Sequence, residues 1–387
     1  MITGLDILCL STQDWNDVWT RKQRFMRRLA AQGNRVLYVE TQLSLASVGR
    51  LRTDKWRPFR WLRGPREIEP NLFIGTLPLV LPGFQMWPAV NSVNNFGLRL
   101  LLRQWLRALG FEAPILWTYN PYSENLVGTL GERFAIYECV DELTASRGLV
   151  RSEVVRAQEA RLLSKVRAAI VTHDNLYRSK RNAVREIHLI PNGAEIEHLR
   201  RVVDDPSLTV PTDMASLPRP VVGFLGSVMY WLDFDLLRSL ALARPQWSFA
   251  FVGPVGRLAD LHKIRLPNVH LLGRKPYEDV PAYVKGFDVC LNPYLMDETA
   301  ANCSPLKLYE YLASGRPVVS TDMPEARKFE DVVGIGETHA EILQRLEEAL
   351  RPEAKSPEAV ARRLAVALPH SWDQRFARAE QVLATLA

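Results

Sequence analysis

Residues 304–319 read SPLKLYEYLASGRPVV, which predicts a short helix that leads into a buried strand. Pro305 favours the first turn of a helix, and Gly315 is typical of the position just past a helix end. The first backbone N–H groups of a helix lack helical partners and lie at the positive end of its dipole. We therefore expect the backbone at Ser304, Pro305 and Leu306 to present donors to an anion such as a diphosphate.

Two charged side chains extend this pattern. Lys307 would add a full positive charge beside the helix start, and Glu310 lies about 4.5 Å further along the axis. A carboxylate at that place can accept hydrogen bonds from both hydroxyls of a ribose. The alternative interpretation is an ordinary surface ion pair between Lys307 and Glu310 on an amphipathic helix.

Short apolar runs alternate with helical patterns on both sides of this segment. In the first half, residues 5–10, 35–39, 114–117, 135–140 and 168–171 read as strands. A second series of the same kind begins after the turn-forming Pro191-Asn192-Gly193. The alternation predicts an α/β protein with two doubly wound, Rossmann-like domains. The carboxyl ends of their strands are expected to face a central cleft, since such sheets bind ligands there.

A chain of 387 residues is longer than one hydrophobic core usually supports. We predict an N-terminal acceptor-binding domain over residues 1–190 and a C-terminal donor-binding domain over 191–368. Residues 369–387 form a separate segment in which Trp372 and Phe376 begin a helical apolar stripe. We expect this last helix to pack back on the N-terminal domain.

Residues 304–319 resemble the donor-binding signature of family 4 glycosyltransferases, which have the two-domain GT-B fold, use nucleotide-sugar donors and retain anomeric configuration. In that family the second glutamate of a Glu-x7-Glu motif binds the donor ribose, and Glu310 matches it, followed by ASGRPV at 313–318. The run PNGAE at 191–195 is similar to the family's interdomain turn, and FVGP at 251–254 to one of its strand ends. The resemblance covers residues 187–320 in order.

The chain departs from the family pattern at two places. Asn302 stands where the first glutamate of the motif is expected, and residues 226–233, GSVMYWLD, lack the usual Gly-Arg…Lys pair. The pattern Gly-x-x-x-x-Trp-x-Asp resembles a narrower group associated with teichuronic acid, capsule and exopolysaccharide assembly, in which the equivalent of Lys307 contacts phosphate. Arg274 is a second candidate for that contact. The other donor-binding residues that we expect are Gly226, Ser227, Tyr230, Gly253 and Tyr294.

Asp141 directly follows the apolar run at residues 135–140, so we expect it at the carboxyl end of a strand. A carboxylate there can take the proton of an acceptor hydroxyl, which makes Asp141 the candidate catalytic base and Glu142 its substitute. The alternative is that Asp141 caps the following helix. In the family's retaining reaction, Lys307 would stabilise the departing diphosphate. No Asp-x-Asp motif stands where a metal-dependent transferase needs one, so we expect neither a metal nor another cofactor.

The loop at residues 11–20 follows the first predicted strand and is expected to contribute to the acceptor site. Its candidate acceptor-binding residues are Trp15, Asn16 and Trp19, since aromatic faces suit both sugar rings and lipid tails. The alternative is that one or both tryptophans belong to the core.

The composition indicates a protein of the cytoplasm. The four cysteines are far apart and follow no metal-ligand spacing, as is typical of reduced, buried thiols. The first twenty residues lack the basic and apolar regions of a secretory signal, and no apolar run is long enough to span a bilayer.

A basic segment between Arg50 and Arg66 contains seven arginines and lysines against the single acid Asp54, with aromatic residues among them. A predicted helix near residues 98–109 adds three more arginines at four-residue spacing. We expect these regions to dock on an anionic membrane surface, while the alternative is a solvated basic face. No nucleic-acid motif accompanies the charge, so nucleic-acid binding is not expected.

The sequence as a whole predicts a hexosyltransferase that uses a nucleoside diphosphate sugar, a UDP-sugar being the preferred donor. The acceptor is expected to be lipid-linked or a polysaccharide at the cytoplasmic membrane face. Two alternatives remain: a nucleotide-sugar 2-epimerase of the same fold, and a non-catalytic GT-B protein that binds a nucleotide or polymer. Asn302 and the missing basic pair keep the latter alternative open.

Overall fold

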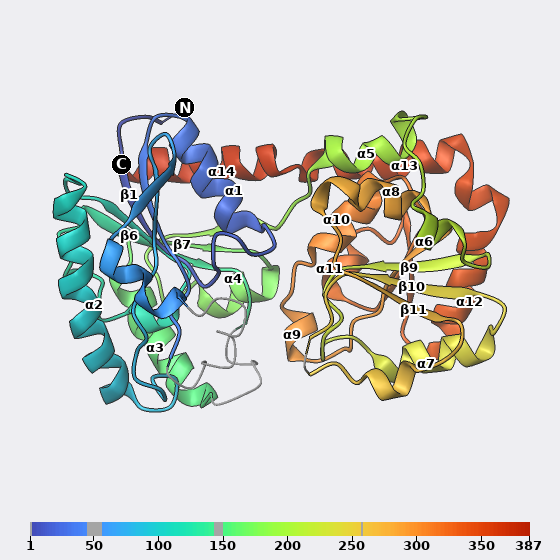
Figure 1. The fold of residues 1–387 in the computed structure, drawn as a ribbon, viewed down its shortest axis with the longest axis horizontal. Coiled ribbons are helices and arrows are strands. Elements are labelled where there is room, and N and C mark those ends of the chain that lie inside the picture. Colours follow the sequence, from blue (N-terminus) through green and yellow to red (C-terminus); the bar gives the residue numbers. More distant parts are fainter. Residues whose placement is uncertain (1, 45–55, 143–149, 257) are drawn as a thin grey trace. The chain divides into compact units, whose positions relative to one another are not determined.

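The chain divides into two compact α/β units (Figure 1). The structure, a computed structural model, describes residues 2–44, 56–142, 150–256 and 258–387. The first unit comprises Met1–Pro191 and Phe376–Ala387, and the second comprises Asn192–Arg375. Each unit contains one mostly or wholly parallel sheet with helices on both faces, which confirms the predicted class of two doubly wound, Rossmann-like domains.

The first unit is built on an eight-stranded sheet of order β3-β4-β2-β1-β5-β6-β7-β8. All its strand pairs are parallel except β3 with β4. The four central strands are almost entirely buried because helices cover both faces, as expected for a parallel sheet. The strands are β1 (Asp6–Leu10), β2 (Arg35–Val39), β3 (Arg66–Glu69), β4 (Leu72–Gly75), β5 (Ile115–Thr118), β6 (Phe134–Cys139), β7 (Ala168–Val171) and β8 (Ile187–Leu189).

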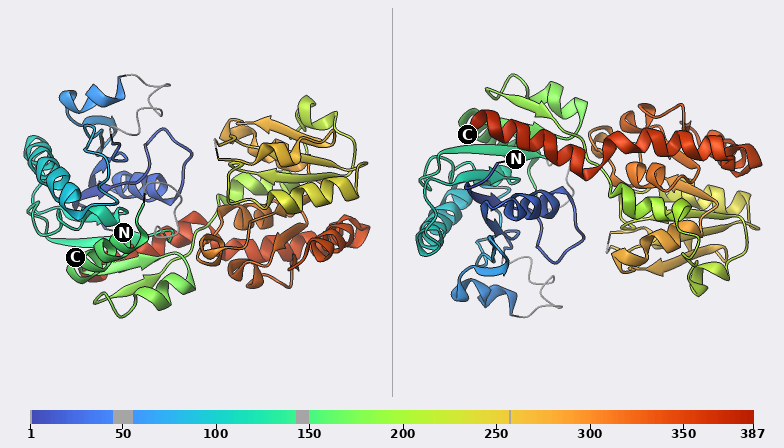
Figure 2. Two further views of the ribbon diagram at one scale, coloured as in Figure 1. Left: turned by 90° about the horizontal axis from the view of Figure 1, so that it is seen from below. Right: turned by 90° about the horizontal axis from the view of Figure 1, so that it is seen from above.

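Helices of the first unit lie in two layers, which Figure 2 shows from two sides. On one face, α2 (Pro88–Ala108) and α3 (Ser152–Lys165) pack on leucines of β1 and β2. On the other face, α1 (Arg21–Ala31) meets α14 (Trp372–Leu386), where the rings of Phe25 and Phe376 lie 5.7 Å apart. The end of α14 thus packs within the first unit. The remaining elements of this unit are η2 (Arg57–Arg63), η3 (Pro121–Ser123) and α4 (Asp174–Lys180).

The second unit is built on a six-stranded parallel sheet of order β11-β10-β9-β12-β13-β14. Its strands are β9 (Val221–Leu225), β10 (Ser248–Val252), β11 (Val269–Gly273), β12 (Val289–Asn292), β13 (Val318–Thr321) and β14 (Val333–Gly336). Its helices are α5 (Ile196–Asp204), α6 (Thr212–Ala215), α7 (Phe234–Ala243), α8 (Val280–Lys285), α9 (Glu298–Ala301), α10 (Leu306–Ala313), α11 (Pro324–Arg327), α12 (His339–Leu350) and α13 (Pro357–Ala367). The central strand β9 continues into the loop that carries several of the expected donor-binding residues.

Candidate functional site

The start of α10 is held in place by the turn that opens the second unit. The backbone N–H of Asn192 donates to Ser304 Oγ at 3.2 Å, and its side-chain amide donates to the Ser304 carbonyl at 2.7 Å. Ser304 Oγ also shares a hydrogen bond of 2.9 Å with the Tyr309 hydroxyl. The side chain of Ser304 is therefore engaged. The expectation for Pro305 as a donor is wrong, because proline has no N–H, and only Ser304 and Leu306 can offer backbone donors there.

Lys307 crosses directly over the first glycine after β9. A Cβ atom built at Gly226 would lie 2.0 Å from Lys307 Cε and 2.6 Å from its Nζ. The Lys307 ammonium also lies 5.7 Å from the centre of the Phe224 ring. Any side chain at 226 would displace this lysine, so glycine is required there for the cation to reach the edge of the sheet.

Two glycines let neighbouring loops of this edge approach one another. Gly226 has φ +135° and its N–H donates to the Val252 carbonyl at 2.7 Å, while Gly253 has φ +150°. A Cβ atom at Gly253 would lie 2.1 Å from the Gly226 carbonyl oxygen. Only glycine adopts such a backbone without strain, and close backbone approach of this kind is typical of phosphate-binding loops.

Glu310 lies three residues after Lys307 on α10, and both residues are half-buried. Burial lowers the pKa of Lys307, and the charge of Glu310 opposes this by raising it. The helix is also anchored at Tyr311, one turn after Lys307, because the Tyr311 hydroxyl accepts a hydrogen bond of 2.7 Å from the Leu225 backbone N–H. The helix thus presents one cation and one carboxylate at the carboxyl end of β9.

The other expected donor residues lie in three loops that follow strands of this sheet. Ser227 and Tyr230 belong to the loop after β9, which is tied to Tyr294 by an isolated bridge between Leu232 and Tyr294. Tyr294 is buried, and Arg274 is exposed directly after β11. The structure therefore places these four residues on loops at the strand carboxyl ends, while Lys307 and Glu310 lie on α10.

Trp231 is a candidate donor contact that the sequence interpretation did not select. Its ring packs edge-on against Tyr230, with centroids 5.2 Å apart. Its indole Nε1 is buried and has no hydrogen-bond partner among the described residues. Asp233 of the same pattern caps α7, since its carboxylate accepts a hydrogen bond of 2.8 Å from the Leu236 N–H. In this Trp-x-Asp pattern, Trp231 therefore offers an indole N–H as a hydrogen-bond donor, and Asp233 caps α7.

Asp141 lies just beyond the carboxyl end of β6, as expected. It does not cap the next described helix, because α3 starts at Ser152 with Arg151 as its N-cap residue. Much of the residue is exposed, yet the surrounding protein desolvates its carboxyl group and raises its pKa, against the lowering effect of Lys22 and Arg21.

Glu142, the substitute base, already has a structural partner. Its carboxylate forms an ion pair of 3.2 Å with Lys180, and Lys180 also bonds Glu159 at 2.7 Å. These carboxylates contribute to holding the pKa of Lys180 above its ordinary range. Of the two acids, Asp141 is thus the one that the described ion pairs leave outside this network.

Lys22 is the charged residue of this edge that the sequence interpretation missed. It is the second residue of α1, and its ammonium lies 5.5 Å from the centre of the ring of Tyr119, the residue after β5. Burial lowers the pKa of Lys22, and Asp141 is the largest opposing influence. The sequence did contain a signal for this site. The first turn of α1 has the basic pair Arg21-Lys22 and no acid, although acidic residues are normally favoured at a helix start.

Arg21 neutralises a carboxylate buried beneath this edge. Arg21 and Glu138 form an ion pair with no exposed surface, and the Trp117 indole donates to Glu138 at 2.7 Å. Arg21 Nη1 also donates to the Ile190 carbonyl at 2.8 Å. A buried charge requires such pairing, so Glu138 and Arg21 fix α1 on β6. Of the two cations at the start of α1, Lys22 lowers the pKa of Asp141 more than Arg21 does.

The three expected acceptor residues differ in exposure. Trp15 is only 7% exposed and packs edge-on against Tyr38 at 5.1 Å, so it offers a ligand little surface. Asn16 is exposed, and Trp19 is half-buried beneath the guanidinium of Arg27. The core alternative fits Trp15, while Asn16 and Trp19 keep surface that a ligand can reach.

The expected basic docking segment contains one residue with a different role. Arg57 is buried and forms a bidentate pair with Asp14, at 2.7 and 2.9 Å, and also donates to the Thr41 carbonyl at 2.9 Å. It is therefore structural. Arg60 and Arg63 of η2 are exposed beside Trp56. Residues 50–55 of the predicted segment lie outside the described residues.

Within the described parts of the chain, no helix is long and apolar enough to cross a membrane. The same parts contain no cluster of three or more histidine, cysteine, aspartate or glutamate side chains that could hold a metal ion.

Comparison with known sequences identifies the second unit. Residues 219–365 match the family described as Glycosyl transferases group 1. The chain is also 30% identical, over 209 residues, to TuaH of Bacillus subtilis (strain 168), which is named for glycosyl transfer in teichuronic acid biosynthesis. This match covers 50% of the chain and 52% of TuaH, so it spans about half the length of this curated relative.

Solved structures with the same fold cover nearly the whole chain. Sucrose-phosphate synthase of Thermosynechococcus elongatus has a TM-score of 0.71 at 15% identity and covers 99% of both chains. The UDP-forming α,α-trehalose-phosphate synthase of Burkholderia xenovorans, solved with glucose-6-phosphate, has a TM-score of 0.70 at 12% identity, covering 98% of this chain and 100% of that one. HepE of Anabaena, solved with UDP and glucose, has a TM-score of 0.65 at 14% identity, with coverages of 98% and 100%. Residues 219–365 therefore match the group 1 glycosyltransferases, the family 4 that the motifs resemble, and the chain has the GT-B fold with TuaH as a distant homologue.

Proposed function

We propose that this chain transfers a sugar from a nucleoside diphosphate sugar to a hydroxyl group of a lipid-linked or polysaccharide acceptor. The observation that carries the proposal is the position of Lys307, whose side chain crosses Gly226 at the end of β9 while Glu310 lies on the same helix. A cation, a helix start and a glycine loop together suit a diphosphate, and a carboxylate beside them suits a ribose.

The second unit would bind and activate the donor. As the bond between the sugar C1 and the diphosphate oxygen breaks, negative charge gathers on the leaving diphosphate. The Lys307 ammonium and the N–H groups at the start of α10 are preorganised to stabilise that charge. This chemistry needs no metal ion, and we propose that binding and transfer are independent of divalent cations.

The first unit would supply the acceptor side of the reaction. The acceptor hydroxyl oxygen forms the new bond to the sugar C1, and its proton passes to the Asp141 carboxylate. General-base assistance of this kind contributes about 10²- to 10⁴-fold to a rate. Retention of the anomeric configuration is proposed from the family resemblance.

UDP is the proposed leaving nucleotide, and a cell-envelope polysaccharide or its lipid-linked precursor is the proposed acceptor class. HepE was solved with UDP and glucose, and the trehalose-phosphate synthase is named as UDP-forming. TuaH is named for teichuronic acid biosynthesis. We further propose that the protein works at the cytoplasmic membrane face, with the exposed Arg60 and Arg63 of η2 and the preceding Trp56 contributing to contact with lipid.

Calorimetric titration with UDP, GDP, ADP and dTDP tests the donor site directly. Each titration is made with and without a chelator, on the wild type, on Glu310→Ala and on Glu353→Ala. Glu353 is an exposed carboxylate of the same unit in η7 (Pro352–Lys355) and serves as the matched control. We expect chelator-insensitive binding of one nucleotide. Loss of a hydrogen-bonded carboxylate in Glu310→Ala should weaken it about 10- to 100-fold, while Glu353→Ala leaves it unchanged.

Binding without sugar release or transfer to any membrane extract would favour the non-catalytic alternative. Turnover of the nucleotide sugar without any acceptor would favour the epimerase. Absence of binding to all four nucleotides would remove the donor-site assignment altogether.

A further inference from the structure

The first half of α2 is oriented with its polar side chains inward and its apolar side chains outward. Asn91 and Asn95 are 0% and 2% exposed, whereas Val93, Phe96 and Leu100 are 60%, 59% and 54% exposed. Their spacing of three and four residues places these apolar side chains on one helical stripe. A helix of a water-soluble protein normally shows the opposite arrangement.

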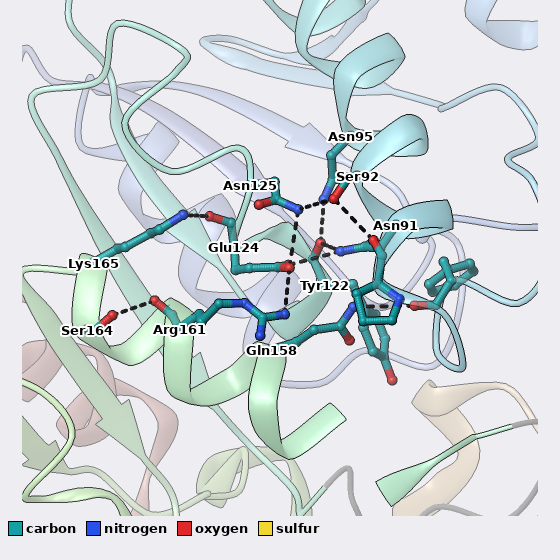
Figure 3. Close-up of polar contacts among 12 residues, drawn as sticks. Asn91, Ser92, Asn95, Tyr122, Glu124, Asn125, Gln158, Arg161, Ser164 and Lys165 are labelled. Atoms are coloured by element: carbon teal, nitrogen blue, oxygen red, sulfur yellow. Dashed lines mark hydrogen bonds and ion pairs between the residues drawn. The ribbon is translucent and has the colours of Figure 1, made fainter. Parts of the chain in front are cut away.

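Hydrogen bonds fix this orientation, as Figure 3 shows. The Asn91 amide donates to the Tyr122 carbonyl at 2.9 Å and to Glu124 Oε2 at 3.0 Å, and the Asn95 amide donates to the same carbonyl at 2.7 Å. Glu124 is buried and forms an ion pair of 3.4 Å with Arg161 of α3. The buried amide groups donate these bonds inward and hold the helix in one rotation, so the outward stripe cannot turn inward without breaking the network.

The outward face of α2 carries only positive charge. Its sequence contains no aspartate or glutamate, and Arg103 and Arg107 continue the stripe one and two turns beyond Leu100. Arg99 lies at the flank, with its guanidinium 4.9 Å from the centre of the Phe96 ring. Three exposed apolar side chains followed by exposed arginines complement a surface that is negatively charged outside and apolar beneath.

We propose that the outward face of α2, formed by Val93, Phe96, Leu100, Arg103 and Arg107, docks on an anionic lipid surface. The apolar side chains enter the boundary between headgroups and acyl chains, and the arginines bind the headgroups. The benefit of docking, access to a membrane-borne acceptor, rests on the proposed function. The binding itself needs neither nucleotide nor acceptor.

Co-sedimentation with vesicles tests this surface in the full chain. The vesicles contain either phosphatidylcholine alone or phosphatidylcholine with about 30% phosphatidylglycerol as the anionic lipid. We expect strong preference for the anionic vesicles. The variant Arg103→Gln/Arg107→Gln should bind them about 30-fold more weakly, and Val93→Ser/Phe96→Ser/Leu100→Ser should lose most binding to them.

Leu242→Ser is the matched control, because Leu242 is 55% exposed on α7 in the second unit. It should bind vesicles like the wild type. Nucleotide titration of every variant shows separately whether the donor site is intact, so failure of docking and failure of the proposed function are distinguishable. Unchanged sedimentation of both α2 variants would overturn the proposal. So would a wild-type dimer that the serine variant dissociates, because the stripe would then bind a second copy of the chain.

Discussion

The carboxyl edges of the two sheets carry their charges in different ways. In the second unit, the edge depends on backbone approach, and Lys307 reaches it by crossing Gly226. In the first unit, the edge depends on paired side chains, since Arg21 neutralises the buried Glu138. Burial raises the pKa of Asp141, and the charge of Lys22 is the largest influence that opposes this rise. On the candidate donor side, the shape of the backbone therefore controls the position of the cation. On the candidate acceptor side, the balance of nearby charges influences the pKa of the carboxyl group.

Replacing Asp141 by asparagine should have the largest effect, because it removes a proton acceptor while keeping the shape. Transfer should fall about 10²- to 10⁴-fold, and nucleotide binding should stay unchanged. Initial rates of nucleotide release in the presence of acceptor measure the first quantity, and calorimetry the second. Glu142→Gln is the control, since Glu142 pairs with Lys180, and near-normal turnover of Asp141→Asn would remove this residue from the chemistry.

Replacing Arg21 by methionine should come next, in stability rather than in rate. It leaves Glu138 buried without its cation, which should cost about 3–5 kcal/mol. The control is Arg27→Met on the same helix, because Arg27 pairs with Glu69 at the surface and should contribute about 0–1 kcal/mol. Denaturant unfolding of both variants measures the difference, and equal losses would show that the buried pair is not what holds α1.

Replacing Gly226 by alanine should act on the donor side alone. The added Cβ would overlap the Lys307 side chain, so the cation must move away from the edge. Nucleotide binding should weaken about 10- to 100-fold, as expected for the loss of one charge-assisted contact. Gly273→Ala is the matched control, because Gly273 also has a positive φ, +73°, but open space where its Cβ would be. If both variants bind nucleotide equally, the Lys307 contact does not contribute.

Most of the fold could be predicted because local sequence patterns indicate its helices and strands. Alternating apolar runs indicated the two parallel sheets, and the helix of residues 304–319 begins at Leu306 and ends at Ala313, as its proline and glycine indicate. The inverted orientation of α2 could not be predicted in this way. Its asparagines face inward only because Tyr122 and Glu124, about thirty residues away along the chain, accept their hydrogen bonds.

The two candidate sites also differ in how far local sequence patterns predict them. Several of the expected donor residues are close together in the sequence, so their spacing alone indicates a site. On the acceptor side, Lys22, Tyr119 and Asp141 lie far apart in the sequence and meet only because β1, β5 and β6 are neighbours in the sheet. Arg57 shows that charge composition alone does not predict the partner of a side chain. Its charge indicated a lipid contact, but its partner in the structure is Asp14.

Replacing Lys22 by glutamine should have the smallest effect, a shift of the pH dependence. The Lys22 ammonium lowers the pKa of Asp141, so its loss should raise that pKa. A base must be deprotonated to act, and the acid limb of kcat/KM should therefore move to higher pH, by about 0.5 to 1 unit for one partly screened charge. Transfer rates from pH 4 to 8, on the order of the range a carboxylate base can control, measure the shift.

Lys22→Arg is the matched control, because it keeps the charge and should keep the wild-type profile. The other charged or titratable groups near Asp141 and Lys22 include Arg21, Glu138, Cys9 and the buried Tyr119, whose pKa burial raises. Arg21 and Glu138 neutralise one another, and the buried Cys9 thiol stays protonated because burial raises its pKa. The Cys9 thiol should therefore not change its charge in this range, and a shift in Lys22→Gln alone would assign the acid limb to Asp141. An unshifted limb in that variant would show that the charge balance of this edge does not control the base, and the contrast between the two edges would then rest on packing alone.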